Sequence, residues 1–343
     1  MTRAPLAIST GDPGGVGPEI SLRTALAECE HDAVVVFGDA AWLGARALEL
    51  GAQQAQLVRI AAHERLELPR GTIGLADVGV AWDAEALAHR GSARGGLAQL
   101  RALDLATAAA RSGLARGLVT APMSKAAVNL AGFDFVGHTE HLAKAAGLPD
   151  DAVTMMFLGP KLRVALVTTH VAIAELPREI TRPRVLRTIR HLAEALVRDA
   201  KADGRTRAID LVVTGLNPHA GEEGLFGDEE PRVIEPAMRD ALALASVVEG
   251  RVTLRGPMPA ETAFRQAAAG SIDGIIAMMH DQATIASKLL DWGQAVNVTW
   301  GLPFVRTSVD HGVAYDAAQS GEIDTEGMRS AFRLAQRLTA YAA

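Results

Sequence analysis

The stretch LAISTGDPGGVGPEISLRTALAECEHDAVVVF, Leu6 to Phe37, predicts the fold class. It contains an apolar strand (Leu6–Ser9), a glycine-rich turn, a helical stretch (Gly17–Cys29) and a second apolar strand (Ala33–Phe37). Strands rich in Val, Ile and Leu without polar alternation are typical of a sheet that is buried on both faces. A strand, a helix and a strand in succession indicate a parallel βαβ unit.

The same alternation continues along the rest of the chain. Further strands are predicted at Gly117–Thr120, Thr154–Leu158, Leu162–Thr169, Leu211–Thr214, Val252–Leu254, Gly274–Met278 and Val296–Thr299. Further helices are predicted at Gly95–Arg111, His138–Ala146, Arg184–Ala200, Pro231–Ala245 and Thr325–Ala340. The pattern predicts an α/β protein built on parallel strands.

Length and composition exclude several classes of protein. The 343 residues correspond to two domains of ordinary size, and 49% hydrophobic with 22% charged residues is typical of a globular chain. A net charge of −6 argues against nucleic-acid binding. The first ten residues, MTRAPLAIST, lack the apolar core of a signal peptide, and no run of about 18 apolar residues occurs, so neither a secretory leader nor a membrane span is expected. The single cysteine, Cys29, suits a reducing compartment, so a cytoplasmic protein is expected.

Three of the ten histidines follow apolar strands directly. His170 follows VALVTT, His219 follows LVVTGLNP and His280 follows GIIAMM. Ligands of open α/β sheets bind beyond the carboxyl ends of the strands, where three imidazoles could hold a catalytic metal ion. Nitrogen ligands favour zinc, with cobalt or nickel as alternatives. Three unrelated loop histidines are the other interpretation. The histidines in polar or helical contexts, expected at the surface, are His31, His63, His89 and His191.

Two short segments have the composition of anion-binding turns. The segment GDPGGVGPEI (Gly11–Ile20) joins a strand to a helix and could bring backbone close to a phosphate or cofactor. It matches neither the Rossmann nor the P-loop pattern, and a simple tight turn explains it equally well. In GHTEH, His138 and Thr139 begin a helix and could donate to an anion, although plain helix capping is the alternative.

The chemistry-bearing residues are densest after His280. Lys288, Asn297 and Arg306 supply two positive charges and one amide from a helix, a strand and a loop. Arg and Lys are the usual clamps for phosphate or carboxylate groups. For Lys288 a solvated helix face is an equally good interpretation.

These segments together resemble the 4-hydroxythreonine-4-phosphate dehydrogenases of vitamin B6 synthesis (the PdxA family) and their close relatives. The shared motifs are GDPGGVGPE, TAPMSK, GHTE, TTH, GLNPHAGEEGLFG, GPMPAET, HDQ and NVTWGLPFVRTSVDHG. They run from about residue 8 to residue 316, nearly the whole chain.

The resemblance implies two α/β/α domains with a cleft between them, as in isopropylmalate and isocitrate dehydrogenases. It implies a first, cofactor-side domain over residues 1–125 and 290–343 and a second domain over 126–289 that carries the metal and the dimer contacts. A homodimer with its active site near the subunit interface is also implied, with no nucleic-acid or membrane partner.

Roles for individual residues follow from the matching motifs. The implied metal ligands are His170, His219 and His280, the same three that the strand ends indicate. The implied substrate-binding residues are His138, Thr139, Lys288, Asn297 and Arg306. The implied cofactor-binding residues are Gly11, Asp12, Asp310, His311 and Gly312. Lys288 and a metal-bound water are both open as the general base.

The implied reaction is metal-dependent oxidation of 4-phosphohydroxy-L-threonine by NAD or NADP. Its β-keto acid product decarboxylates to 3-amino-2-oxopropyl phosphate, a precursor of pyridoxal phosphate. The expected ion is zinc, with cobalt, magnesium, manganese or nickel as alternatives. The alternative substrates within the family are 4-phospho-D-threonate and D-erythronate, and the more distant alternatives are an acyl phosphate transferase and a non-catalytic metabolite-binding protein. Val313, Ala317 and Gln319 depart from the family's usual cofactor loop, which leaves NAD and NADP both open.

Overall fold

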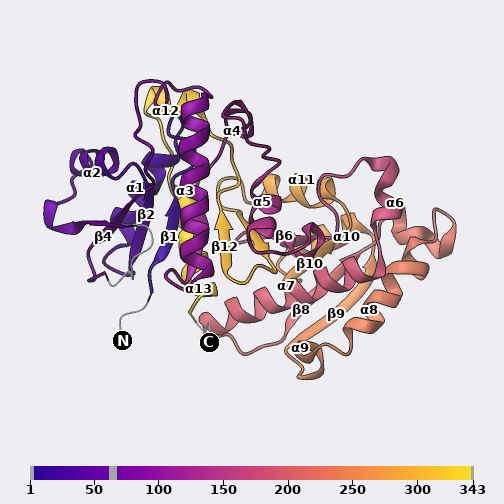
Figure 1. Cartoon of the computed structure of the whole chain (residues 1–343). Helices are drawn as coiled ribbons and strands as arrows, with labels where there is room; N and C mark the ends of the chain where they lie inside the picture. Colours follow the sequence, from indigo (N-terminus) through magenta and orange to yellow (C-terminus); the bar gives the residue numbers. More distant parts are fainter. Residues whose placement is uncertain (1–3, 62–67, 341–343) are drawn as a thin grey trace. The chain divides into compact units, whose positions relative to one another are not determined.

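The computed structural model describes residues 4–61 and 68–340. The chain divides into two compact units: unit 1 comprises Met1–Asp150 and Leu302–Thr339, and unit 2 comprises Asp151–Gly301. Among its described residues each unit contains six β-strands with helices packed on both faces (Figure 1). No described helix combines the length and the apolar character that a membrane span requires.

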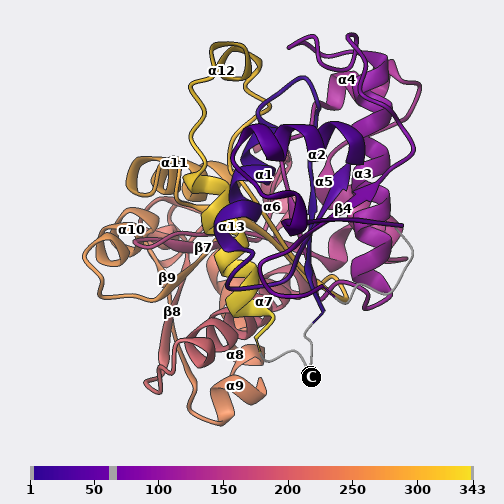
Figure 2. The same ribbon diagram turned by 90° about the vertical axis from the view of Figure 1, so that its left-hand side faces the viewer.

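The strands of unit 1 all run parallel, in the order β3-β4-β2-β1-β5-β12. The chain moves in opposite directions along this sheet from β1 to β2 and from β4 to β5. Right-handed crossovers therefore place α1 and α3 on opposite faces, and α13 packs beside α1 (Figure 2). The strands are β1 (Leu6–Ser9), β2 (Val34–Gly38), β3 (Leu57–Ile60), β4 (Ile73–Asp77), β5 (Gly117–Thr120) and β12 (Val305–Ser308). The helices are α1 (Gly17–Glu28), α2 (Ala40–Glu49), η1 (Gln54–Gln56), α3 (Ala93–Arg111), α4 (Lys125–Leu130), α5 (His138–Ala145), α12 (Tyr315–Ser320) and α13 (Glu326–Leu338).

The strands of unit 2 form a mixed sheet in the order β11-β6-β7-β10-β8-β9. β6 runs antiparallel to both of its neighbours, and the other pairs are parallel. The strands are β6 (Thr154–Leu158), β7 (Arg163–Leu166), β8 (Ile209–Thr214), β9 (Val252–Met258), β10 (Gly274–Ala277) and β11 (Val296–Trp300). The helices are η2 (Asp150–Ala152), η3 (Ile173–Glu175), α6 (Leu176–Glu179), α7 (Arg182–Ala202), η4 (Pro218–Gly224), η5 (Glu230–Ile234), α8 (Glu235–Ala241), α9 (Ala245–Val248), α10 (Ala260–Ala268) and α11 (His280–Leu290).

Strand β10 shows which helices cover each face of the unit 2 sheet. Ile275 packs in a buried cluster that includes Ala263 of α10 and Ala283 of α11. A Cβ atom at the preceding residue, Gly274, would lie 2.8 Å from Cδ1 of Leu196 on α7. Since successive residues of a strand point to opposite faces, α7 covers one face and α10 with α11 covers the other.

The α/β prediction is confirmed, and Leu6–Ser9, Gly117–Thr120 and Thr154–Leu158 are strands at the predicted bounds. The prediction of parallel strands is wrong for β6, because the short turn from β6 to β7 makes a hairpin. The helix predicted at Pro231–Ala245 is divided into η5, α8 and α9. Strands β3, β4 and β12 were not predicted, because their sequences are short or interrupted by polar residues and glycine.

The unit boundaries differ from the predicted domain limits. Residues 126–150 lie in unit 1 and residues 290–301 lie in unit 2. Residues 290–301 belong to unit 2 because they contain β11, which pairs with β6 of that unit along its full length.

The prediction that His191 is a surface residue is wrong. Its side chain is buried on the sheet-facing side of α7, and Nδ1 lies 2.9 Å from Oγ1 of Thr154. Burial lowers the pKa of His191 to about 4, and the positive charges of Arg190 and Arg187 lower it further in the same direction. His31 and His89 are exposed, as predicted, while His63 lies outside the described residues.

The low pKa of His191 makes the stability of the fold depend on pH. As the pH falls, His191 is protonated first in the unfolded chain, where its pKa is near 6.5, and only at lower pH in the folded chain. The free energy of unfolding is therefore expected to decrease as the pH falls from 6.5 to 4, by up to about 3 kcal/mol from this residue. Denaturant unfolding at both pH values, for the native protein and for His191→Asn, measures the effect. The same pH dependence in both proteins would contradict the assignment.

Candidate functional site

A buried guanidinium lies at the centre of the candidate site in unit 1. Arg306 on β12 is 2% exposed, and its Nε and Nη2 atoms donate to Oγ1 of Thr120 at 3.2 and 2.7 Å. Burial lowers the pKa of Arg306 to about 9. Keeping a positive charge at such depth costs free energy, which an anionic ligand would offset.

The amino end of α5 adds a second group that lacks a partner. Nε2 of His138 is buried and has no hydrogen-bond partner. Burial, followed by the positive charges of Arg306, His141 and Lys125, holds the pKa of His138 well below its usual range. Its imidazole is therefore neutral and can donate from one nitrogen. Gly137 gives α5 no side-chain cap, so the first backbone N–H groups of this helix also face its amino end.

These groups together have the chemistry of an anion site. The positive charge of Arg306 lowers the pKa of His138, so the guanidinium lies within electrostatic range of the imidazole. Thr139 is the second residue of α5 and is half-buried. A helix amino terminus combined with a buried guanidinium is a common way to bind a phosphate or a carboxylate.

Two residues of this region were missed by the sequence reasoning. Thr120 ends β5 and holds the Arg306 side chain, and Lys125 begins α4. A Cβ atom at Gly137 would lie 3.6 Å from the Lys125 ammonium nitrogen, which places that charge beside the start of α5. Both residues belong to the motif TAPMSK and its preceding strand, which could have indicated them.

Asp12 anchors the glycine-rich turn after β1. Its buried carboxylate accepts from the Gly14 backbone N–H at 2.9 Å, from Gln99 Nε2 at 3.2 Å and from the Tyr315 hydroxyl at 2.8 Å. Burial raises the pKa of Asp12, and the pKa of Tyr315 is raised for the same reason. At Gly11, φ is +68° and a Cβ atom would lie 2.1 Å from the Pro122 carbonyl oxygen, so only glycine fits.

The loop with the predicted cofactor residues lies against this turn. The Val16 N–H donates to the Val313 carbonyl at 3.0 Å, and the Gly15 Cα approaches Val313 too closely for any side chain. His311 is exposed, with Nδ1 2.9 Å from the Gly312 carbonyl oxygen, and the space around Gly312 is open. Asp310 precedes them and is half-buried. Val313 therefore fixes the loop against the turn, whereas His311 and Gly312 are exposed.

A cavity of about 330 Å³ lies beside the same turn in unit 1. Pro13 and Gly15 line it from the turn, Trp42 from α2, and Ala318 and Ile323 from α12 and the segment after it. An aromatic wall next to open backbone suits a flat organic ring.

Two of the three predicted metal ligands are neighbours in unit 2. The ring centroids of His170 and His280 are 5.6 Å apart. Nδ1 of His280 lies 2.7 Å from Oδ1 of Asp281, which leaves Nε2 of this imidazole for another partner. A carboxylate on the second ring nitrogen is the usual way in which a metal-binding histidine is oriented.

His219 lies in a turn of unusual backbone conformation. Six consecutive residues, from His219 to Gly224, have positive φ values, and His219 itself has φ 53°. Its ring packs 6.2 Å from that of Phe226. Within residues 4–61 and 68–340, no three His, Cys, Asp or Glu side chains are arranged to hold a metal ion. Imidazole nitrogens are suitable ligands for a divalent ion. Of the three histidines, His170 and His280 have neighbouring rings.

Lys288 and Asn297 belong to unit 2 as well. Lys288 lies on α11 two turns after His280, and its ammonium nitrogen is 5.4 Å from the centre of the Trp292 ring. Asn297 is the second residue of β11 and is half-buried. Both units therefore carry predicted substrate-binding residues.

Known proteins match this chain along nearly its whole length. Residues 30–335 match the family described as "Pyridoxal phosphate biosynthetic protein PdxA". A 4-hydroxythreonine-4-phosphate dehydrogenase of Geobacter metallireducens is 39% identical over 340 residues, 98% of this chain and 96% of that protein. A protein of Symbiobacterium thermophilum, provisionally named a D-threonate 4-phosphate dehydrogenase, is 37% identical over 342 residues, 99% of this chain and 98% of that protein.

A solved structure agrees with the sequence matches. The 4-hydroxythreonine-4-phosphate dehydrogenase of Klebsiella pneumoniae has a TM-score of 0.78 and 35% identity, covering 98% of this chain and 99% of that one. These relatives are dehydrogenases, and the motifs that contain His138 and Arg306 lie within the residues that the family model matches. The sequence and the fold thus agree, and the chain belongs to the PdxA family of pyridoxal phosphate biosynthetic proteins.

Proposed function

We propose that this protein oxidises 4-phosphohydroxy-L-threonine with NAD or NADP in a metal-dependent reaction. The observation that carries the proposal is the buried Arg306 guanidinium beside the unpartnered Nε2 of His138 at the uncapped start of α5. Such an arrangement is costly without an anion and is well suited to a phosphorylated acid. The relatives described above act, by name, on substrates of this kind.

Five residues are assigned to substrate binding in this proposal. Arg306, His138 and Thr139 would bind one anionic end through charge-assisted hydrogen bonds. Lys288 and Asn297 would bind polar groups nearer the reacting carbon. Lys288 would also be positioned to accept the proton of the hydroxyl that is oxidised.

The metal ligands in this proposal are His170, His219 and His280. Imidazole ligands suit zinc, with cobalt, nickel, manganese or magnesium as alternatives. A bound ion would supply Lewis-acid stabilisation of negative charge on the substrate oxygen, both during oxidation and during the loss of carbon dioxide that follows. Asp281 would orient His280 by accepting from its Nδ1–H.

The cofactor would bind to unit 1 at the loop Asp310–Gly312 and at the turn that contains Gly11 and Asp12. NAD or NADP would accept the hydride when bound. The open space around Gly312 and the adjoining cavity of about 330 Å³ support this placement. Asp12 would support cofactor binding indirectly, by holding the loop in place. Its carboxylate already accepts hydrogen bonds from Gly14, Gln99 and Tyr315.

Replacing Tyr315 by phenylalanine tests this role of the loop. The change removes the hydrogen bond to the Asp12 carboxylate, and a bond to a charged group contributes about 1.5–3 kcal/mol. The KM for the cofactor is expected to rise about tenfold, while kcat changes less than about twofold. Steady-state kinetics of Tyr315→Phe, with Ser320→Ala on the same helix as control, measure the split. An unchanged KM in Tyr315→Phe would contradict the proposal.

We also propose a homodimer formed through α11. Ile285 and Leu289 of this helix and Trp292, two residues after its end, are exposed at 60%, 80% and 76%. Large exposed apolar side chains so close in the sequence are typical of an interface. The same helix carries His280 and Lys288, so this interface would lie near the active site. The free, buried Cys29 is consistent with a cytoplasmic location.

A side-by-side assay tests the proposed function. The purified protein is given 4-phosphohydroxy-L-threonine, 4-phospho-D-threonate or 4-phospho-D-erythronate, each with NAD and with NADP, and reduced cofactor is measured. The highest kcat/KM is expected for 4-phosphohydroxy-L-threonine. Preference for a phosphorylated sugar acid would instead establish the second candidate, which the Symbiobacterium relative supports. Absence of reduced cofactor with all three compounds would contradict a dehydrogenase.

A further inference from the structure

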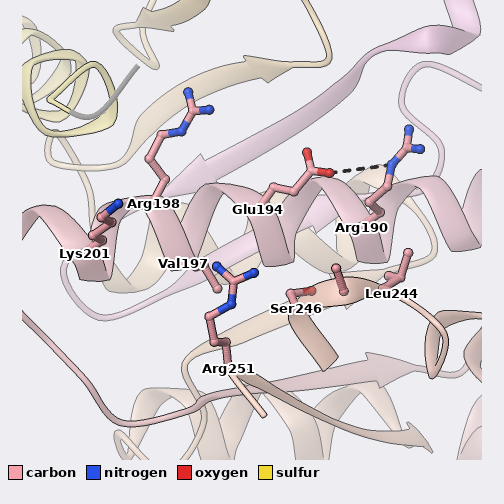
Figure 3. Close-up of a pocket in the computed structure, with 9 residues that line it drawn as sticks. Arg190, Glu194, Val197, Arg198, Lys201, Leu244, Ser246 and Arg251 are labelled. Atoms are coloured by element: carbon pink, nitrogen blue, oxygen red, sulfur yellow. Dashed lines mark ion pairs between the residues drawn. The ribbon is translucent and has the colours of Figure 1, made fainter. Parts of the chain in front are cut away.

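A cationic cavity of about 480 Å³ lies in unit 2, away from all the site residues described above (Figure 3). Helix α7 forms one wall, and α9 with the segments on either side of it forms the other. We name it the α7 pocket, lined by Arg190, Glu194, Val197, Arg198, Lys201, Leu244, Ala245, Ser246 and Arg251. Its volume falls within the range of small-molecule sites.

The charge of the α7 pocket is opposite to that of the whole chain. Its lining includes four cations and one acid, whereas the protein has a net charge of −6. Arg190, Glu194 and Arg198 follow one another at intervals of four residues, so they share one face of α7. Arg251 comes from the opposite wall, and its guanidinium lies below α7 next to Val197, whereas the side chains of Arg190, Glu194 and Arg198 extend upward from the helix (Figure 3). A concave surface lined by one sign of charge concentrates ligands of the other sign.

The single acid of the pocket neutralises little of this charge. Glu194 is 3.9 Å from Nε of Arg190, a long ion pair, and its other oxygen accepts from Nε1 of Trp300 at 3.1 Å. Arg198 lies 5.2 Å from the centre of the Trp300 ring, a contact that leaves its charge in place. Arg251 pairs with Glu249, which lies outside the pocket lining.

The walls also offer apolar and hydroxyl groups. Val197, Leu244 and Ala245 provide an apolar surface, and Ser246 provides a hydroxyl at the start of α9. We infer that the α7 pocket binds a small phosphate ester with several negative charges, whose organic part packs on these apolar residues. Guanidinium and ammonium groups are the residues that recognise phosphates, and a purely inorganic ion would leave the apolar wall uncovered.

The pocket is a second site on unit 2. Helix α7 covers the sheet face opposite α11, the helix that carries His280 and Lys288. Trp300 connects the pocket to β11, because it contacts Glu194 and Arg198 and follows Asn297 by three residues. An anion that draws Arg198 away from the indole changes the surroundings of Trp300, so its fluorescence reports binding. This inference stands whether or not the proposed reaction is correct.

Binding of pyrophosphate and of a nucleoside triphosphate tests the inference, with the neutral nucleoside as control. Calorimetry and Trp300 fluorescence are expected to show saturable binding of the triphosphate below about 1 mM, weaker binding of pyrophosphate and none of the nucleoside. Arg198→Gln and Arg251→Gln are each expected to weaken the affinity at least tenfold. Glu194→Gln, which keeps an acceptor for Trp300, is expected to strengthen it.

Two matched variants separate the α7 pocket from other sites. Arg265→Gln removes an exposed arginine of α10 and is expected to leave the affinity unchanged. Arg306→Met removes the anion site of unit 1 and is expected to leave it unchanged as well, which distinguishes pocket binding from substrate-site binding. The inference is overturned if no probe binds below about 1 mM, or if Arg198→Gln and Arg251→Gln bind as the native protein does.

Discussion

Replacing His280 by alanine is expected to lower kcat about a thousandfold, with little change in the thermal midpoint. His280 begins α11 with a partly exposed side chain, and its ring nitrogen Nδ1 interacts with Asp281 and Thr284 of the same helix. The fold therefore loses little when the imidazole is removed. The reaction would lose a ligand of the ion that stabilises the substrate's negative charge, a contribution of several kcal/mol. Steady-state kinetics at saturating substrate and metal, together with a thermal melt, measure both effects.

Two further variants are compared with His280→Ala. His31→Ala removes an exposed histidine of unit 1 and is expected to leave kcat unchanged. Asp281→Asn keeps the shape of the Nδ1 partner but removes its charge, and is expected to weaken the metal affinity about 10- to 100-fold. Near-native turnover of His280→Ala in metal-depleted buffer would contradict the metal-dependent reaction.

Replacing Arg306 by methionine is expected to lower kcat/KM by about 10²- to 10³-fold. Methionine fills much of the same buried volume, so the core around β12 stays packed, while the charge and the donors of the guanidinium disappear. A charge-assisted clamp on a phosphate or carboxylate contributes about 3–4 kcal/mol when its site excludes water. The loss is expected mainly in KM, since the anionic end of the substrate is bound in the ground state as well.

The control for this variant is Arg101→Met, an exposed arginine of α3 in the same unit. It is expected to have native kinetics. Adding the phosphorylated substrate is expected to raise the thermal midpoint of the native protein and of Arg101→Met, and to leave that of Arg306→Met unchanged. Substrate stabilisation of Arg306→Met equal to that of the native protein would show that the anion binds elsewhere.

Regular strand–helix alternation made much of the fold predictable from sequence. Continuous apolar runs such as Gly117–Thr120 and Thr154–Leu158 are buried on both faces, and their bounds were predicted correctly. Periodicity does not report the direction of a strand, so the antiparallel β6 was predicted wrongly. The helix at Pro231–Ala245 is interrupted because prolines and the turn at Leu242–Leu244 divide it.

The candidate site was predictable where a residue follows a strand or begins a helix. His170, His280 and His138 were predicted in this way, and the structure places the rings of the first two next to each other in unit 2. Thr120 and Tyr315 were missed, because their roles depend on contacts with Arg306 and Asp12, residues nearly two hundred and about three hundred positions away in the chain. Sequence spacing gives no indication of such long-range contacts.

The metal content of His219→Ala tests the central claim most directly. The native protein and the variant are purified in buffer containing zinc, separated from free ion by gel filtration and analysed for bound metal per chain. We expect one zinc ion per chain in the native protein and less than about a tenth of that in the variant, since loss of one of three protein ligands removes most of the affinity. Zinc bound to His219→Ala at the native level would contradict a centre built from His170, His219 and His280.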